Sequence, residues 1–156
     1  MRRMRVAVVG AAALGVVLAA ALPGAAVGAP EADLAYHGGV SMVGGRVDLR
    51  LTPRNYGPSA VPDATVRLRW SVAPVSKQAL PAGCVRSGER VMLCRVGALA
   101  AKAVARQIRL RVRLKGAPSE VRVEIDTVWN GGTVDRHRHN DRQRVLVLAT
   151  GDEYSF

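Results

Sequence analysis

Two cysteines are the residues of this chain whose chemistry follows most directly from their type and number. Cys84 and Cys94 are the only cysteines in the 156-residue sequence. An even number of cysteines in an exported chain indicates a disulfide, and two thiolates without a nearby histidine do not complete a metal site. We expect a local bridge that stabilises the fold by about 2–3 kcal/mol on the chain-entropy model.

A histidine pair is the second group with recognisable chemistry. On an extended strand His137 and His139 would point to the same side, where they could bind zinc or copper weakly. The arginines between and beside them repel a divalent cation, and His37 is distant in sequence. We therefore expect a solvated loop over residues 135–142, with no metal and no cofactor.

The sequence contains no recognised catalytic motif. It lacks a G-x-S-x-G nucleophile elbow, an H-E-x-x-H zinc motif and a phosphate-binding glycine loop. Glu124 and Asp126 alternate outward among arginines, which predicts cross-strand charge pairs rather than an acid–base couple. We expect that the protein is not an enzyme.

Positive charge is the remaining chemical signal. The net charge of +11 falls to +8 when the three arginines of the N-terminal segment, Arg2, Arg3 and Arg5, are removed. Outward-facing arginines would form basic stripes if their two strands were neighbours: Arg67, Arg69, Arg109, Arg111 and Arg113. Such a face would attract an anionic cell-wall polymer or another surface protein. A second interpretation stays open, because arginine with abundant alanine, glycine and valine is also typical of a GC-rich genome.

Nucleic acid is not the expected partner of this basic surface. Proteins that bind single strands interleave basic residues with exposed aromatic side chains on which bases stack. The aromatic residues that we expect to be exposed are Tyr36, Tyr56 and Tyr154, and they do not alternate with the arginines.

The first 28 residues predict a helical secretory signal peptide. Three arginines begin the segment, an apolar run follows over residues 6–22, and small residues at 26–28 offer a cleavage site before Ala29. An uncleaved membrane anchor is the alternative, although the run lies at the lower limit for spanning a bilayer. We expect a signal peptide at 1–28 and one domain at 29–156, secreted or held in the cell envelope. Membrane contact would involve only the signal segment.

Alternating apolar and polar residues indicate β-strands along most of the remaining chain. The predicted strands are 46–51, 65–72, 90–96, 108–115, 121–129 and 145–148, with a weaker edge strand within 31–37. Thr52-Pro53 is expected to end one strand, and Asn130-Gly131 predicts a two-residue hairpin turn. Trp70 and Trp129 fall on apolar sides and are expected in the core.

These elements predict an all-β fold. About seven short strands without a convincing helix are typical of a two-sheet antiparallel sandwich, with the immunoglobulin-like arrangement as first choice. In antibody domains a tryptophan lies between the two cysteines, which join distant strands across the core. Here Trp70 precedes both cysteines, so the predicted bridge is local.

Several short motifs, taken in order, carry a resemblance to a known family. They are Ala32-Asp33-Leu34, Asn-Tyr-Gly-Pro-Ser at 55–59, Leu-Pro-Ala-Gly-Cys at 80–84, the segment 91–99 with its Cys-x-x-Gly-x-Leu pattern, and Asp135 with Asn140-Asp141. Over residues 32–148 they resemble the immunoglobulin-like repeat of unassigned function from bacterial, chiefly actinobacterial, secreted and cell-surface proteins. The resemblance implies a sandwich, export and a spacer or adhesive role, and it brings no catalytic residues. The chain departs from the pattern as a single copy, without a wall-sorting signal, and with Asp141 for the second asparagine.

The sequence thus predicts a secreted, non-enzymatic β-sandwich domain that acts as a binding or structural module at the bacterial cell surface or outside it. A passive envelope protein is one alternative. A secreted inhibitor or toxin-like factor that acts on another protein is another.

Overall fold

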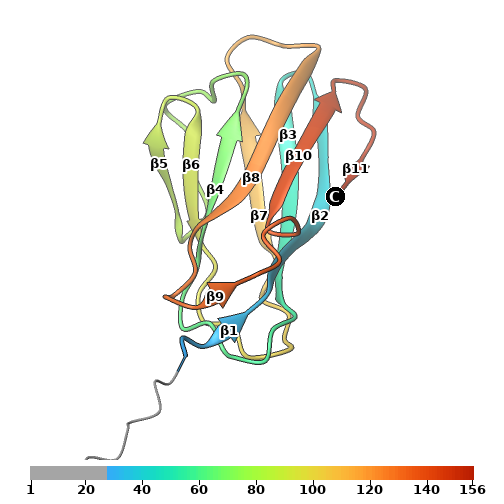
Figure 1. Cartoon of the computed structure of the whole chain (residues 1–156). Helices are drawn as coiled ribbons and strands as arrows, with labels where there is room; N and C mark the ends of the chain where they lie inside the picture. Colours follow the sequence, from blue (N-terminus) through green and yellow to red (C-terminus); the bar gives the residue numbers. More distant parts are fainter. Residues whose placement is uncertain (1–27) are drawn as a thin grey trace, which may run out of the picture.

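Strands and loops, without helices, make up residues 28–156, which are the residues described by the computed structural model (Figure 1). Two antiparallel sheets form the body of the fold. One has five strands in the order β10-β8-β4-β6-β5, and the other has four in the order β11-β2-β3-β7. These sheets confirm the all-β, two-sheet prediction. The predicted signal segment lies outside the described residues except for Gly28.

The five-stranded sheet is built from segments whose apolar residues alternate. It consists of β10 (Arg142–Leu148), β8 (Glu120–Trp129), β4 (Thr65–Trp70), β6 (Val91–Arg95) and β5 (Cys84–Gly88). On β4, Val66, Leu68 and Trp70 are buried while the residues between them face outward. Trp70 is therefore a core residue, as predicted.

The four-stranded sheet contains a hairpin with a two-residue glycine turn. It consists of β11 (Tyr154–Ser155), β2 (Leu34–Val43), β3 (Arg46–Asn55) and β7 (Ile108–Arg113). Gly44 and Gly45 join β2 to β3 with φ values of 53° and 72°. Two successive positive φ values favour glycine and match the twist of the flanking strands.

One hydrophobic core lies between the two sheets. Its largest fully buried members come from both sheets and include Tyr36, Met42, Leu49, Leu68, Met92, Leu110 and Ile125. A smaller cluster of Ala32, Leu34, Val61, Ala64 and Leu99 fills one end of the fold. Near this end β1 (Glu31–Ala32) pairs in parallel with β9 (Val134–Asp135). No helix among these residues is long and apolar enough to cross a membrane.

The weak edge strand predicted within 31–37 is instead a full strand inside the sheet. β2 has 10 residues and lies between β3 and β11. Gly38 and Gly39 interrupt its apolar pattern, since they carry no side chain. A Cβ at Gly39 would overlap the side chain of Glu153. The prediction missed both this close approach and the short strands β5 and β11.

Pro53 does not end its strand. β3 continues to Asn55, because the N–H of Tyr36, the residue opposite Pro53, donates to Asn140 rather than to β3. The Tyr36–Pro53 pair therefore exchanges no backbone hydrogen bonds, and a proline is tolerated there.

Four further predictions are wrong. Trp129 is 53% exposed. A register shift between Thr65 and Val66 of β4 inserts one extra residue of β8 before Trp129. This bulge turns the Trp129 side chain to the outer face of the sheet. Asn130-Gly131 does not form a hairpin, since the chain continues into β9, which pairs with β1. The loop predicted as solvated contains the buried Asp141, and Tyr36, predicted to be exposed, is fully buried.

Candidate functional site

The two cysteines form the predicted local bridge. Cys84 on β5 lies directly opposite Cys94 on β6, with an S–S distance of 2.03 Å. Both residues are buried against the core, and the bridge holds the outermost strand of the five-stranded sheet. A disulfide is compatible with a location outside the cytoplasm.

The structure separates the arginines that were predicted to form one basic face. Arg67 and Arg69 lie on β4, whose neighbours are β8 and β6. Arg109, Arg111 and Arg113 lie on β7, at the edge of the other sheet. Because the sheets pack through their inner faces, these two groups point to opposite sides of the sandwich.

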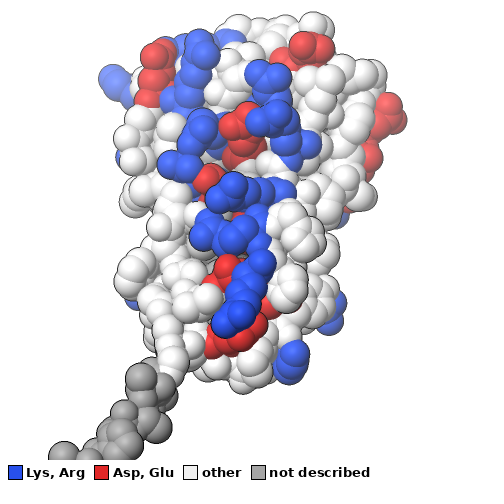
Figure 2. Space-filling model, in the orientation of Figure 1, with Lys and Arg blue, Asp and Glu red and all other residues white. Residues whose placement is uncertain are grey.

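On the five-stranded sheet several arginines surround a few carboxylates (Figure 2). The register forms two rows across β4, β8 and β10, namely Arg69, Glu124, Arg144 and Arg67, Asp126, Arg142. Arg67 Nε donates to Asp126 Oδ1 at 3.0 Å, and Arg144 Nε lies 3.2 Å from Glu124 Oε1. The predicted cross-strand charge pairs are confirmed, and they neutralise part of this face.

The arginines of β7 lie beside a strand that is also basic. The opposed residues of β3 and β7 are Arg46 with Arg113, Asp48 with Arg111 and Arg50 with Arg109. Two of these pairs bring like charges together, an arrangement that costs stability in a sheet. We call the surface formed by Arg46, Arg109, Arg111 and Arg113 the basic edge.

Carboxylates reach only part of this surface. Arg111 Nε donates to Asp48 Oδ2 at 3.2 Å, and Glu153 forms an ion pair with Arg50. Within residues 28–156, the side chains of Arg46, Arg109 and Arg113 have no carboxylate at ion-pair distance. The basic edge therefore keeps positive charge that the protein does not neutralise.

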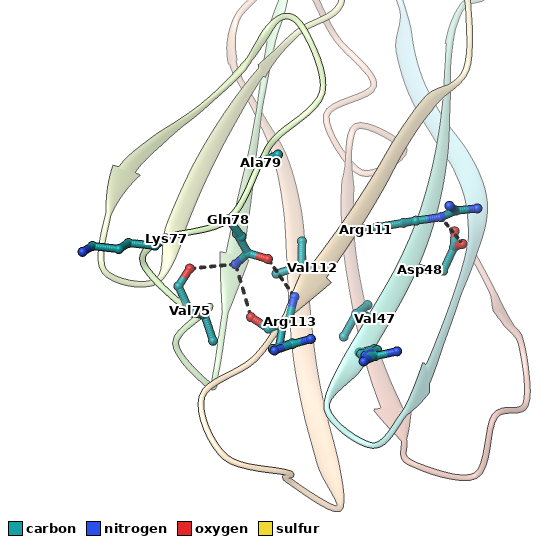
Figure 3. A pocket seen from close by; sticks show the side chains of 10 residues that line it. Val47, Asp48, Val75, Lys77, Gln78, Ala79, Arg111, Val112 and Arg113 are labelled. Atoms are coloured by element: carbon teal, nitrogen blue, oxygen red, sulfur yellow. Dashed lines mark hydrogen bonds and ion pairs between the residues drawn. The ribbon is translucent and has the colours of Figure 1, made fainter.

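An open hollow of about 560 Å³ lies beside the basic edge (Figure 3). Its lining includes Val47, Val112 and the segment 75–79. Gln78 fixes this segment, since its Oε1 accepts from Arg113 N at 2.8 Å and its Nε2 donates to Val75 O at 2.8 Å. The hollow thus combines apolar lining with basic side chains at its rim.

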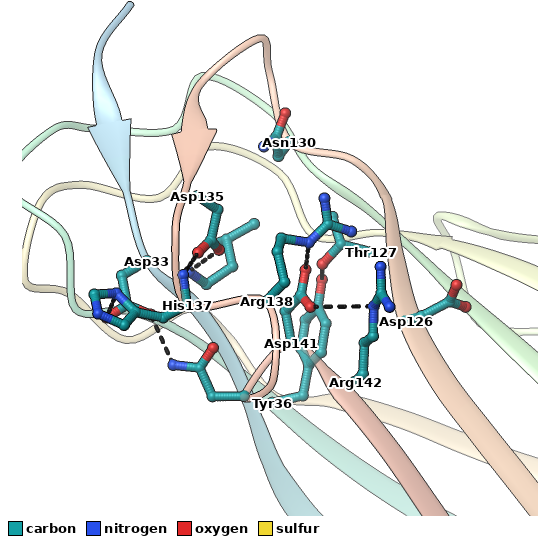
Figure 4. A network of polar contacts seen from close by, with 12 residues as sticks. Asp33, Tyr36, Asp126, Thr127, Asn130, Asp135, His137, Arg138, Asp141 and Arg142 are labelled. Atoms are coloured by element: carbon teal, nitrogen blue, oxygen red, sulfur yellow. Dashed lines mark hydrogen bonds and ion pairs between the residues drawn. The ribbon is translucent and has the colours of Figure 1, made fainter.

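A buried polar network joins β2, β8 and the loop before β10 (Figure 4). Tyr36 Oη lies 2.7 Å from Thr127 Oγ1, and Arg138 Nε lies 3.0 Å from Asp141 Oδ2. Burial raises the pKa of Asp141, against the opposing effects of a hydrogen bond with Thr127 and the charge of Arg138. Burial also raises the pKa of Tyr36. The network keeps a neutral phenol and a buried carboxyl in fixed positions.

His137 and His139 lie near each other with differently oriented rings. The rings of His137 and His139 lie 6.3 Å apart and edge to face. His137 Nδ1 lies 3.5 Å from Asp33 Oδ2, and ligand atoms of Asp33, Asp135 and His137 come within 4.8 Å of one another. Asp135 Oδ2 accepts from Leu34 N at 2.9 Å. These contacts tie β9 and its following loop to β2, which accounts for the cluster structurally.

Two residues of the basic edge and its hollow, Arg46 and Gln78, were not predicted as site residues from the sequence. The alternation in 46–51 placed Arg46 on the outer face of its strand, but only the strand order shows that it lies opposite Arg113. For Gln78 the sequence carries no signal, because its role depends on where the loop before β5 meets β7.

Comparisons with protein-family models, with curated proteins and with solved structures found no match to this chain. The immunoglobulin-like resemblance therefore stays a prediction from the sequence motifs.

Proposed function

We propose that this chain is a secreted, non-enzymatic binding domain of immunoglobulin-like type that captures an anionic partner through its basic edge. The observation that carries the proposal is the set of unneutralised arginines Arg46, Arg109 and Arg113, two of which lie directly opposite each other. Opposed like charges destabilise a sheet, and an anion bound across them would remove that cost.

The location and fold in this proposal have separate support. The disulfide and the predicted signal segment favour a protein outside the cytoplasm. The order of β2, β3 and β7 in one sheet and β10, β8 and β4 in the other is that expected for strands A, B, E and G, F, C of an immunoglobulin-like sandwich. The disulfide departs from the antibody pattern, since it joins neighbouring strands of one sheet. The non-enzymatic part rests on the absence of a catalytic motif from the sequence.

A pull-down on cell wall and on immobilised polyglutamate at low and high salt tests this function. The edge variant carries Arg46→Gln, Arg109→Gln and Arg113→Gln. The matched control, which removes the same charge from the other sheet, carries Arg69→Gln, Arg122→Gln and Arg144→Gln. We expect salt-sensitive retention of the native protein and of the control, and about tenfold weaker binding of the edge variant, if each arginine contributes about 0.5 kcal/mol. Retention that is absent, insensitive to salt or equally reduced in both variants would refute the proposal.

A further inference from the structure

We propose that the anionic partner is an extended acidic peptide that adds as a strand to the free edge of β7. The inference rests on the proposed function, because it uses the charge of the basic edge. It goes further by identifying the partner as a polypeptide and its main contact as backbone hydrogen bonding, the mode called β-augmentation.

Backbone directions along β7 show which groups are free. Leu114 N donates to Gly45 O on the β3 side at 2.8 Å, and Val75 N donates to Arg113 O from the opposite side at 2.8 Å. Because these directions alternate along a strand, the N–H and C=O groups of Arg109 and Arg111 also point away from β3. No backbone hydrogen bond of the described chain uses them on that side.

The other edges of the two large sheets of the described chain are less open. β10 packs against β2 and β11. β5 carries a register shift between Arg86 and Gly88, and such bulges discourage further pairing. β11 has only 2 residues. The middle of β7 has neither a bulge nor a proline, and it is available to pair with an incoming strand.

Charge favours an acidic segment over a second copy of this chain. Two β7 edges in register would oppose arginine with arginine, which is unfavourable. A peptide with acidic residues at alternate positions would instead place them on the same face as Arg109, Arg111 and Arg113.

The opposite face of such a peptide would meet an apolar wall. The hollow beside the basic edge continues along β7, where Ala79, Leu80 and Pro81 line a neighbouring depression with Arg109 and Arg111. Small apolar residues between the acidic ones would contact this wall. The fitting sequence therefore alternates acidic and apolar residues.

The inference is tested by the affinity for a peptide of alternating glutamate and valine with both termini blocked. This peptide has 6 residues, the length of β7. A second peptide has the same side chains with N-methyl groups on the residues whose N–H would face β7. We expect the first peptide to bind and the methylated one to bind about tenfold more weakly, because backbone donors are lost while all charges stay.

A pair of variants gives the same test from the protein side. Arg109→Pro removes an N–H that points away from β3, whereas Arg109→Ala removes only the side chain. We expect Arg109→Pro to bind the glutamate–valine peptide several-fold more weakly than Arg109→Ala, with melting curves confirming that both are folded. If Arg109→Pro fails to fold, the comparison of the two peptides with the native protein still tests strand addition.

The outcomes separate this inference from the proposed function. Equal binding of both peptides would overturn strand addition, as would tighter binding of a flexible wall polymer than of either peptide. Both outcomes would still support a basic edge that binds anions. Binding of no anionic probe in a salt-sensitive way would overturn the proposed function as well.

Discussion

Tyr36, Thr127 and Asp141 form a buried polar group between β2, β8 and the loop before β10. Tyr36 Oη and Thr127 Oγ1 share a hydrogen bond of 2.7 Å, and Asp141 Oδ2 lies 3.0 Å from Arg138 Nε. The sequence placed Tyr36 and Asp141 on the surface because each lies in a polar neighbourhood along the chain. Their burial depends on β2 and the loop before β10 meeting in space, which no local pattern records.

The raised pKa of Asp141 predicts a specific pH dependence of stability. Between the ordinary value of 3.8 and the raised folded-state pKa, the folded protein binds more protons than the unfolded chain, so the free energy of unfolding falls as pH rises. We expect the difference in unfolding free energy between native protein and Asp141→Asn to decrease from acid to neutral pH. Urea denaturation at several pH values measures it. A difference that grows with pH would show that Arg138 and Arg142 outweigh burial.

At the scale of elements, Asn55 explains why the Asn-Tyr-Gly-Pro-Ser segment has its residue types. Its fully buried amide makes four hydrogen bonds: Oδ1 accepts from Asp33 N and Gly57 N, and Nδ2 donates to Ser59 O and Ala100 O. A Cβ at Gly57 would lie 2.5 Å from Ala32 Cα. The motif is thus a structural junction between β2, the end of β3 and the loop before β7.

Replacing Asn55 tests this junction. Asn55→Ala leaves two backbone N–H groups and two carbonyls without their partner, so we expect a loss of about 3 kcal/mol or more in unfolding free energy. Tyr56→Phe, in the same turn but exposed, should change stability by less than about 0.5 kcal/mol. Chemical denaturation of both variants measures the contrast, and similar losses would contradict it.

The disulfide is expected to add stability without being required for folding. It closes a separation of 10 residues, which gives about 2–3 kcal/mol and about 10 °C in melting temperature. Most members of the core come from β2, β3, β4, β7 and β8 rather than from the two bridged strands. Thermal melts with and without reductant measure the shift, and thiol labelling without reductant should find no free cysteine. Global unfolding on reduction, or an unchanged melting temperature, would show that this estimate is wrong.

Alternation made several elements predictable and left others hidden. β3, β4, β6, β7 and most of β8 follow from their alternating residues, because one face of each is buried. β2 was underestimated because Gly38 and Gly39 carry no apolar side chain. The orientation of Trp129 depends on a bulge, which has no signature in the sequence.

At the scale of the whole molecule, the strand order decides what the arginines do. β4 lies beside the acidic positions of β8, so its arginines become part of a charge lattice. β7 lies at an edge beside another basic strand, so its arginines stay unneutralised. The sequence identified both groups of residues, but it could not show that they lie on opposite faces, because neighbours in a sheet are set by long-range packing.

A titration of the isotope-labelled protein with polyglutamate, followed by amide NMR shifts, tests most directly whether anions bind at the basic edge. We predict salt-sensitive shifts at Arg46, at residues 75–79 and at residues 109–113, with little change on the outer face of the five-stranded sheet. Shifts centred on Arg67, Arg69, Arg122 and Arg144, or no salt-sensitive shifts at all, would contradict this account.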